Sequence, residues 1–230
     1  MVLSCKKTGR GEEMFSKALD IRPGVTAVIG GGGKTSLLRR LGEELSQTSS
    51  VLLCTTTKIY PFQGIPAVHS LEELERVNEP LVCMGTALEN GKLTAPSVPM
   101  EVLAKRFDYV LVEADGSAQR PVKAHAPHEP VIPPESADVI LVVGASGFGR
   151  PIAQAAHRPE RYAALADRKE EDIVTAKVAA QVVTAEGLHR KIFVNQAEEN
   201  LAYAREFAAL MQGCIVLGSI QKGEIYSCSF

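Results

Sequence analysis

The chain has 230 residues, of which 45% are hydrophobic and 23% are charged, and its formal net charge is −2. This length suits one sizeable α/β domain, because chains usually split into several domains only above roughly 250–300 residues. The small net charge argues against a nucleic-acid-binding surface or an acidic tail. We therefore expect a single domain over residues 1–230.

The sequence also indicates a cellular compartment. No apolar stretch reaches the roughly 20 residues that a membrane span needs. The N-terminal "MVLSCKKTGRGEEMF" lacks the apolar centre of a secretory signal. The five cysteines are scattered, and several lie in apolar runs such as "VLLC" and "LVCMG", where cysteine acts as a small core residue. These features predict a cytoplasmic protein.

Apolar runs alternate with helical patterns along most of the chain. In order, we expect strand 25–29, helix 35–45, strand 51–55, helix 71–77, strand 81–85, helix 98–105, strands 109–113 and 139–143, helices 159–166 and 175–185, strand 191–195, helix 198–211 and strand 214–217. The strands are continuously apolar, as in sheets covered by helices on both faces. This predicts an α/β fold with three layers and a mostly parallel central sheet.

Two segments fall outside this alternation. "ENGK" at 89–92 predicts a tight turn at the tip of a hairpin. Residues 116–136, "GSAQRPVKAHAPHEPVIPPES", contain five prolines, which exclude a regular helix or central strand. We expect a long ordered loop over the sheet's edge there, and loops of this length are usually functional or mobile.

The stretch "VIGGGGKTSLLRR" at 28–40 predicts a phosphate-binding loop between a strand and a helix. The spacing G-x-x-x-x-G-K-[ST] would need a glycine at position 28, where Val28 stands, but the shorter G-x-x-G-K-T loop of Mur-type ligases is matched. Glycines allow the backbone N–H groups to approach phosphates, and the helix start adds its positive dipole end. Lys34 would pair with the β- and γ-phosphates and Thr35 would ligate Mg²⁺. The expected phosphate-binding set is Gly30, Gly31, Gly32, Gly33, Lys34, Thr35 and Ser36. The alternative is a glycine-rich turn that only connects strand and helix.

A second motif, "FDYVLVEADGS", ends an apolar strand at Glu113. The spacing Glu113-x-x-Gly116 resembles the E-x-x-G signature of metal-insertion GTPases. In that arrangement the glutamate serves the metal and the Gly116 N–H reaches the γ-phosphate. Asp115 is a second candidate for the metal or for polarising the attacking water, whereas an ordinary strand-to-turn junction is the simpler alternative.

The segment Asn195-Gln196-Ala197-Glu198 follows another strand, where GTPases read guanine with Asn-Lys-x-Asp. Asn195 and Glu198 are therefore candidate base contacts. Gln196 replaces the lysine of that motif, and an Asn followed by Glu three residues later also caps helices. ATP and GTP both stay open.

Four further segments are candidates for ligand contact. In "CTTTKIYP" at 54–61, Thr56, Thr57 or Lys58 could touch the γ-phosphate or a substrate, or the threonines simply extend a strand. The 119–129 loop carries Arg120, Lys123, His125 and His128, which predict an anion-binding or partner-binding loop rather than a zinc or nickel site. "GASGFGRP" and "HRPER" bring Arg150, Arg158 and Arg161 as further candidates for phosphate contact.

Taken together, "GGGGKTS", "TTTKIYP", "FDYVLVEADGSAQRPVKAHAPHEPVIP", "HRPER" and "NQAE" resemble the YqeC family of selenium-dependent hydroxylase accessory proteins, which is P-loop NTPase-like. "EADGSAQRPVKAH" is the most specific part. Members are associated with maturation of molybdenum hydroxylases that carry labile selenium. The resemblance implies an accessory nucleotide-binding protein, with Gly33, Lys34 and Thr35 as phosphate and Mg²⁺ residues, Glu113 as the acidic partner and Asn195 as a base contact.

Three hypotheses follow. The first is a Mg²⁺-dependent NTPase that uses ATP or GTP, with Lys34, Glu113 and Asp115 as catalytic residues, and that assists a molybdenum hydroxylase or its cofactor-insertion machinery. The second is a kinase or ligase that passes phosphate to a small substrate held by the 119–129 loop. The third is a non-enzymatic, nucleotide-responsive binding protein. Dimerisation across the nucleotide, common in related metal-insertion GTPases, stays open.

Overall fold

The computed structural model of the protein describes residues 14–229. Their main feature is one nine-stranded sheet in the order β13-β12-β11-β9-β1-β7-β2-β4-β3. Its strands are β1 (Gly24–Gly30), β2 (Val51–Thr55), β3 (Ala67–Val68), β4 (Leu81–Met84), β7 (Tyr109–Glu113), β9 (Ser136–Gly144), β11 (Lys191–Asn195), β12 (Cys214–Ser219) and β13 (Glu224–Ser229). All seven expected strands are present, and they pair parallel with one another. The predicted α/β class with a mostly parallel sheet is confirmed.

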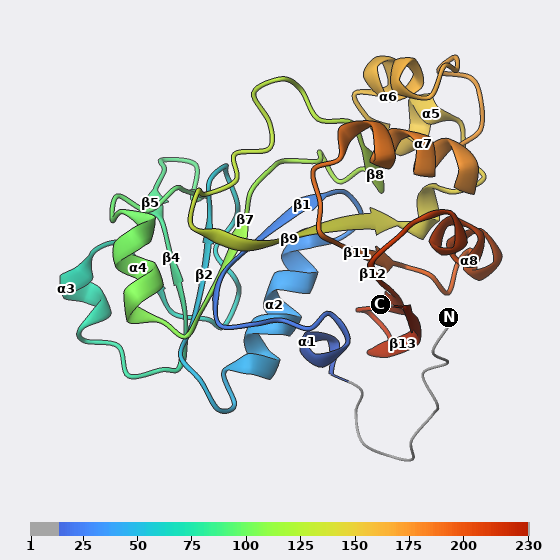
Figure 1. The fold of residues 1–230 in the computed structure, drawn as a ribbon. Helices are drawn as coiled ribbons and strands as arrows, with labels where there is room; N and C mark the ends of the chain where they lie inside the picture. Colours follow the sequence, from blue (N-terminus) through green and yellow to red (C-terminus); the bar gives the residue numbers. More distant parts are fainter. Residues whose placement is uncertain (1–13, 230) are drawn as a thin grey trace.

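Helices surround this sheet (Figure 1). They are α1 (Phe15–Ala18), α2 (Lys34–Leu45), α3 (Leu71–Leu74), α4 (Met100–Arg106), α5 (Ile152–Ala155), α6 (Pro159–Leu165), α7 (Ala176–Glu186) and α8 (Leu201–Leu210), with a 3₁₀ turn at Ala145–Gly147. All six expected helices are present, with ends that differ by a few residues. The largest differences are in α3, which ends at Leu74 rather than 77, and α8, which begins at Leu201 rather than 198.

Both faces of the sheet are covered. On one face, α2 packs Leu37, Leu38 and Leu41 against strand residues that include Val28 and Leu53. On the other face, Leu103 of α4 packs over β2, β4 and β7, while α7 and α8 cover β9, β11 and β12. Figure 1 shows α2 against the middle strands, α3 and α4 at one end of the sheet, and α5 to α8 at the other. This arrangement is compatible with the expected three layers and accounts for the continuously apolar strands.

Of the two strands of this sheet that the sequence did not indicate, β3 and β13, the longer is β13. It pairs antiparallel with β12 at the end of the sheet, and all its residues but the exposed Glu224 are partly buried. An edge strand with one neighbour does not need the apolar run that marks a central parallel strand. Its sequence, "EIYSCS", therefore carried little signal.

The predicted turn at 89–92 is confirmed. It joins β5 (Thr86–Ala87) and β6 (Leu93–Thr94) in a small antiparallel hairpin. The Leu88 N–H donates to the Lys92 carbonyl at 2.8 Å, and Gly91 takes a positive φ of 75°.

The proline-rich segment takes a different path from the one expected. It connects β7 to β9, and these strands flank β1 on either side, so the connection crosses the carboxyl end of β1 near the middle of the sheet rather than at its edge. It is ordered by β8 (Val122–Lys123), which pairs with β10 (Ala156–His157). Two backbone hydrogen bonds anchor it, from the Gly32 N–H to the Arg120 carbonyl and from the Gly144 N–H to the Pro121 carbonyl. The segment therefore lies directly against the glycine loop.

The structure also bears on the expectations drawn from the cysteines and from the absence of a long apolar stretch. Cys54 and Cys83 are buried, and burial raises the pKa of the Cys83 thiol to about 12, so both act as core residues as expected. Within residues 14–229, no helix combines the length and the apolar character that crossing a bilayer requires. The N-terminal segment 1–13 and Cys5 lie outside the described residues.

Candidate functional site

The glycine loop joins β1 to α2 at the carboxyl edge of the sheet. Gly33 precedes the first residue of α2 with a φ of 115°, a backbone conformation that side chains other than glycine rarely adopt. A Cβ at Gly31 would lie 2.6 Å from the Arg120 carbonyl oxygen, and one at Gly33 would lie 2.6 Å from Asn195 Nδ2. Only glycines fit between these neighbours. The loop therefore brings backbone N–H groups and the start of a 12-residue helix to one place.

Lys34 lies beneath this loop and is only 3% exposed. Its ammonium group donates to the Gly30 carbonyl at 2.7 Å and to Ser117 Oγ at 3.2 Å. It also lies 3.1 Å from Asp115 Oδ1, an ion pair without hydrogen-bond geometry. The positive charge is thus held at the floor of the loop, where a phosphate group on the loop amides would meet it.

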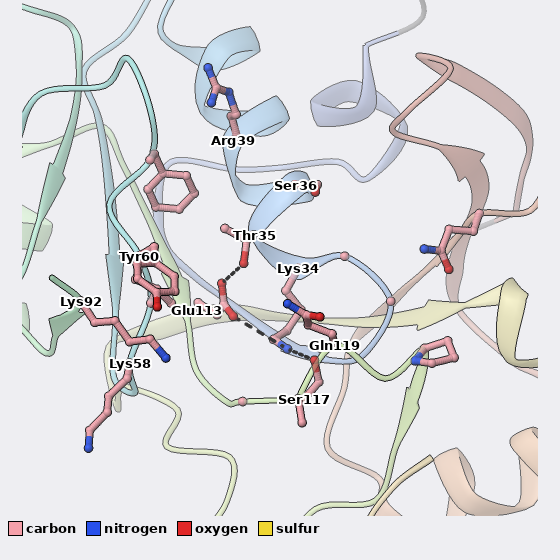
Figure 2. Close-up of a pocket in the computed structure, with 18 of the residues that line it drawn as sticks. Lys34, Thr35, Ser36, Arg39, Lys58, Tyr60, Lys92, Glu113, Ser117 and Gln119 are labelled. Carbon is pink, nitrogen blue, oxygen red and sulfur yellow. Dashed lines mark hydrogen bonds and ion pairs between the residues drawn. The ribbon is translucent and has the colours of Figure 1, made fainter. Parts of the chain in front are cut away.

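Thr35 and Glu113 form a pair beside Lys34 (Figure 2). The Thr35 hydroxyl donates to Glu113 Oε2 at 2.7 Å, and Glu113 Oε1 lies 3.9 Å from Lys34 Nζ. The pairing of β1 with β7 brings these two residues together, because Glu113 at the end of β7 lies opposite Val28, shortly before the glycine loop and Thr35. Burial raises the pKa of the Glu113 carboxyl, and the Lys34 charge and the Thr35 hydrogen bond oppose that rise. A hydroxyl and a carboxylate at one point are hard oxygen ligands of the kind Mg²⁺ prefers.

These residues form the floor of a pocket of about 710 Å³. Its lining residues are Gly32–Ser36, Arg39, Lys58–Gln63, Lys92, Glu113, Gly116–Gln119, Pro121, Ser146, Arg150 and Gln196. Five lining residues are lysine or arginine (Lys34, Arg39, Lys58, Lys92 and Arg150), whereas Glu113 is the one acid among them. A pocket with this excess of positive charge suits a polyanionic ligand.

Asp115 lies behind the glycine loop, fully buried. Its Oδ2 accepts the Gly30 N–H at 2.8 Å and His125 Nε2 at 2.7 Å, and lies 3.1 Å from Lys123 Nζ. Burial raises the pKa of Asp115, but the His125 hydrogen bond and the charges of Lys34 and Lys123 outweigh it and lower the pKa to about 2. The carboxylate therefore stays ionised and fixes both the start of the loop and the lysine beneath it.

Asp115 in turn rests on an extended buried network. His125 Nδ1 lies 2.8 Å from Glu186 Oε2 at the end of α7, and the His125 N–H donates to Glu186 Oε1 at 2.6 Å. Burial lowers the pKa of His125, but its hydrogen bonds with Asp115 and Glu186 outweigh burial and raise it. Lys123 also lies 2.7 Å from Glu129 Oε2. Every charge near Asp115 thus has a partner of opposite sign, as buried charges require.

This network predicts a pH dependence of stability. The folded-state pKa of His125 is above its ordinary value of 6.5. Its contribution to stability is therefore complete below about pH 6.5 and is lost as the pH rises through the folded-state pKa. Thermal unfolding at several values between about pH 5 and about pH 9 would show a smaller alkaline loss for His125→Gln than for the wild type. Equal slopes for both proteins would contradict the assignment.

With this geometry established, comparison with known proteins becomes informative. The family model described as YqeC protein matches residues 26–160. The chain belongs to the YqeC family. "Uncharacterized protein YqeC" of Escherichia coli (strain K12) is 35% identical in an alignment 154 residues long. The alignment covers 62% of this chain. The match spans 60% of that relative's own length. No solved structure matches the chain.

The stretch shared with the YqeC family contains the glycine loop and the segment from Glu113 to His125. Of the residues that the sequence predicted to bind nucleotide or metal in the glycine loop and the Glu113-x-x-Gly116 motif, those lining the pocket are Gly32, Gly33, Lys34, Thr35, Ser36, Glu113 and Gly116. Gly30 and Gly31 belong to the glycine loop but do not line the pocket. Asp115 does not line the pocket, and its position indicates that it holds Lys34 and the loop rather than meeting water or metal.

Asn195 and Glu198 also lie away from the pocket lining. Asn195 Nδ2 donates to the Gly32 carbonyl at 2.8 Å, and its Oδ1 accepts the Ile220 N–H at 3.0 Å. Glu198 Oε1 accepts from Ser219 Oγ at 2.7 Å. Asn195 thus connects the glycine loop to the residue that follows β12. Neither Asn195 nor Glu198 faces the pocket, where a base contact would have to lie. Gln196, the departure from the GTPase motif, is the member of this segment that lines the pocket.

The 119–129 segment differs from the expected surface loop. Lys123 and His125 are buried against Asp115, because β8 turns them inward, so neither is available to an external anion. Within residues 14–229, no group of three or more His, Cys, Asp or Glu side chains has a metal-binding arrangement. Arg158 pairs with Glu129 at 2.7 Å, which leaves Arg150 as the one lining arginine of the three that were nominated.

The threonines of 54–61 have structural roles. Thr55 Oγ1 donates to the Glu113 carbonyl at 2.8 Å, and Thr56 Oγ1 donates to the Val131 carbonyl at 2.7 Å. Lys58 is the nominated residue of this segment that lines the pocket.

Sequence reasoning missed Ser117, Tyr60 and Lys92. Ser117 stands next to the Glu113-x-x-Gly116 spacing, which could have indicated it. Tyr60 and Lys92 reach the pocket through a contact between distant segments, for which the sequence offered no signal.

Proposed function

We propose that this protein is a P-loop NTPase-like domain that binds ATP or GTP with Mg²⁺ in this pocket and hydrolyses it. The observation that carries the proposal is the Thr35 hydroxyl on the Glu113 carboxylate, 2.7 Å apart, directly beside the buried Lys34 amine. A turn that only connects a strand to a helix does not require a buried lysine and a hydroxyl–carboxylate pair beside the start of the helix. Phosphate binding uses all three.

The donor set fits Mg²⁺ specifically. Mg²⁺ is usually held by one or two carboxylates together with phosphate oxygens and several waters, rather than by a cage of protein ligands. Thr35 and Glu113 supply such a partial set, and no group of three or more His, Cys, Asp or Glu side chains among the described residues is arranged to hold a metal ion. When bound, Mg²⁺ would neutralise charge on the β- and γ-phosphates.

The residues of the site then have separate roles. The loop amides and the start of α2 hold the phosphates, and Lys34 exchanges its Gly30 and Ser117 contacts for phosphate oxygens. Asp115 keeps the Lys34 side chain aligned through the ion pair at 3.1 Å. Glu113 is the acid that reaches the pocket, so it orients the metal and the attacking water. Catalysis by such a site comes from positioning and charge neutralisation.

The proposed biological role rests on the resemblance to the YqeC family. Membership supports an accessory role in the maturation of a selenium-dependent molybdenum hydroxylase, with the hydroxylase or its cofactor-insertion machinery as partner. That role places the protein in the cytoplasm, and a homodimer across the nucleotide belongs to the same proposal.

Calorimetric titration with non-hydrolysable ATP and GTP analogues plus Mg²⁺ tests the nucleotide proposal. We expect one analogue to bind the wild type, and Lys34→Ala to weaken it by about 100-fold, since two charge-assisted phosphate contacts are lost. Lys105→Ala, which removes an exposed lysine of α4 with a side chain 73% exposed, is the matched control and should bind normally. Lack of binding by the folded wild type, or equal affinities for wild type and Lys34→Ala, would refute the proposal.

A further inference from the structure

One side of the pocket is built by two segments far apart in sequence. Residue Ile59, just after β2, pairs with Leu93 of the β5–β6 hairpin in an antiparallel bridge. The Ile59 N–H donates to the Leu93 carbonyl at 3.0 Å, and the Leu93 N–H donates to the Ile59 carbonyl at 2.8 Å. Both side chains are buried, at 6% and 2% exposed. This contact fixes how the neighbours of both residues lie.

The bridge sets Tyr60 opposite Lys92, as neighbours of a cross-strand pair. Lys92 Nζ lies 4.9 Å from the centre of the Tyr60 ring, a cation–π contact. Tyr60 is nevertheless 65% exposed, the most exposed large hydrophobic side chain among the described residues. Lys58, Tyr60 and Lys92 all line the pocket, and Figure 2 shows them together on one side of Glu113. We call these three residues the basic side.

The basic side lies beyond the metal end of the phosphate site. In the sheet, β7 lies between β1 and β2, and Thr55 of β2 pairs with Glu113. The segment after β2 is therefore one strand farther from the glycine loop than Glu113 is. Thr35 and Glu113 would hold Mg²⁺ at the end of the loop nearest this side, so a nucleotide's γ-phosphate would face this side. Its nucleoside would leave toward the opposite lining residues, Ser146, Arg150 and Gln196.

The lysines of the basic side differ from Lys34, which lines the same pocket. The Lys34 ammonium group lies 3.1 Å from Asp115 Oδ1. Among residues 14–229, neither Lys58 nor Lys92 has a carboxylate within the 4.0 Å of an ion pair. Two ammonium groups without a carboxylate partner, next to an aromatic ring that lines the same pocket, suit an anion.

We propose that the basic side binds a second ligand, an anionic small molecule with a flat ring, beside the γ-phosphate. The anionic group meets Lys58 and Lys92, and the ring stacks against Tyr60. The inference rests on the proposed function in that the nucleotide occupies the glycine-loop half of the same pocket. It moves the second ligand from the 119–129 loop, whose Lys123 and His125 are buried, to the opposite side of Glu113.

The test uses phenyl phosphate as the probe and the full chain saturated with a non-hydrolysable nucleotide analogue and Mg²⁺. Ligand-detected NMR titration would measure probe affinity for the wild type, Lys58→Ala, Lys92→Ala, Tyr60→Leu and the Lys105→Ala control. We expect each lysine variant to weaken the probe about tenfold, because one charge-assisted contact is lost. Tyr60→Leu should remove the preference for phenyl phosphate over inorganic phosphate, and Lys105→Ala should bind as the wild type does.

Nucleotide affinity, measured separately without the probe, distinguishes the two proposals. Normal nucleotide binding together with a probe that does not bind, or that is insensitive to Lys58 and Lys92, overturns the basic-side inference and leaves the proposed function standing. Loss of nucleotide affinity in Tyr60→Leu also overturns it, because Tyr60 would then belong to the nucleoside site. A wild type that binds no nucleotide overturns the proposed function and, with it, this inference.

Discussion

Replacing Asp115 by alanine is expected to destabilise the protein by about 3–5 kcal/mol, which is the range for removing one partner of a buried charge group. The carboxylate is fully buried, and it compensates the positive groups of Lys34, Lys123 and His125. Without it, three cationic or donor groups would share an apolar interior with less opposing charge. Domain stabilities are about 5–15 kcal/mol, so a loss of this size would leave a marginal fold. Urea unfolding followed by circular dichroism measures it.

The matched control is Asp20→Ala. Asp20 also pairs with a basic residue, Arg22, at 2.8 Å, but their side chains are 48% and 78% exposed. Exposed pairs contribute little because water and salt screen them, so Asp20→Ala should unfold close to the wild-type urea concentration. If Asp115→Ala unfolded there too, the buried network would not support the loop as described. Acid offers a second check, because the Asp115 contribution should disappear as the pH falls from about 3.8 toward its pKa of about 2.

Glu113→Gln is expected to have the largest effect on chemistry. The change keeps the shape and an oxygen for the Thr35 hydroxyl but removes the charge that would serve the metal. Mg²⁺-dependent turnover should fall by about 100-fold, and the factor by which Mg²⁺ strengthens nucleotide binding should fall by about tenfold. Nucleotide affinity without Mg²⁺ should stay equal or rise, because a negative charge near the phosphates is gone. Phosphate release and calorimetry with and without Mg²⁺ measure these quantities.

Glu101→Gln is a suitable control, because Glu101 has the same charge but lies on α4 with a side chain 70% exposed. It should leave turnover and the Mg²⁺ effect unchanged. A Glu113→Gln protein with wild-type Mg²⁺ dependence would show that the acid of the pocket does not serve the metal. The nucleotide could then still bind, so this result would remove the metal assignment while leaving the Lys34 titration to decide on binding.

The two sides of Glu113 give the site a direction. The glycine loop and Lys34 lie on one side, and the basic side of Lys58, Tyr60 and Lys92 lies on the other. A ligand on the basic side would be next to the γ-phosphate, where phosphate could pass to it instead of to water. Under the two proposals, the choice between hydrolysis and phosphoryl transfer in this YqeC-family protein would depend on what the basic side holds.

Much of the architecture follows from local sequence. The apolar strands, the helix that follows "GGGGKT" and the acid at the end of a strand each depend on a few consecutive residues, because strand and helix periodicity and the φ demands of glycine are local. Since parallel strands end at the same edge of the sheet, the same reasoning also brings Thr35 and Glu113 near each other. These features were predictable, and the structure contains all of them.

Other features depended on the tertiary structure. The role of Asp115 depends on its burial, which comes from the 114–135 connection crossing the end of β1 and from Glu186, 61 residues beyond His125. Lys92 reaches Tyr60 only because Ile59 pairs with Leu93. The sequence by itself determined an α/β sheet with a glycine loop between a strand and a helix. Only the tertiary structure decided which charged residues face the pocket and which are buried behind it, because desolvation and charge pairing depend on neighbours that are distant along the chain.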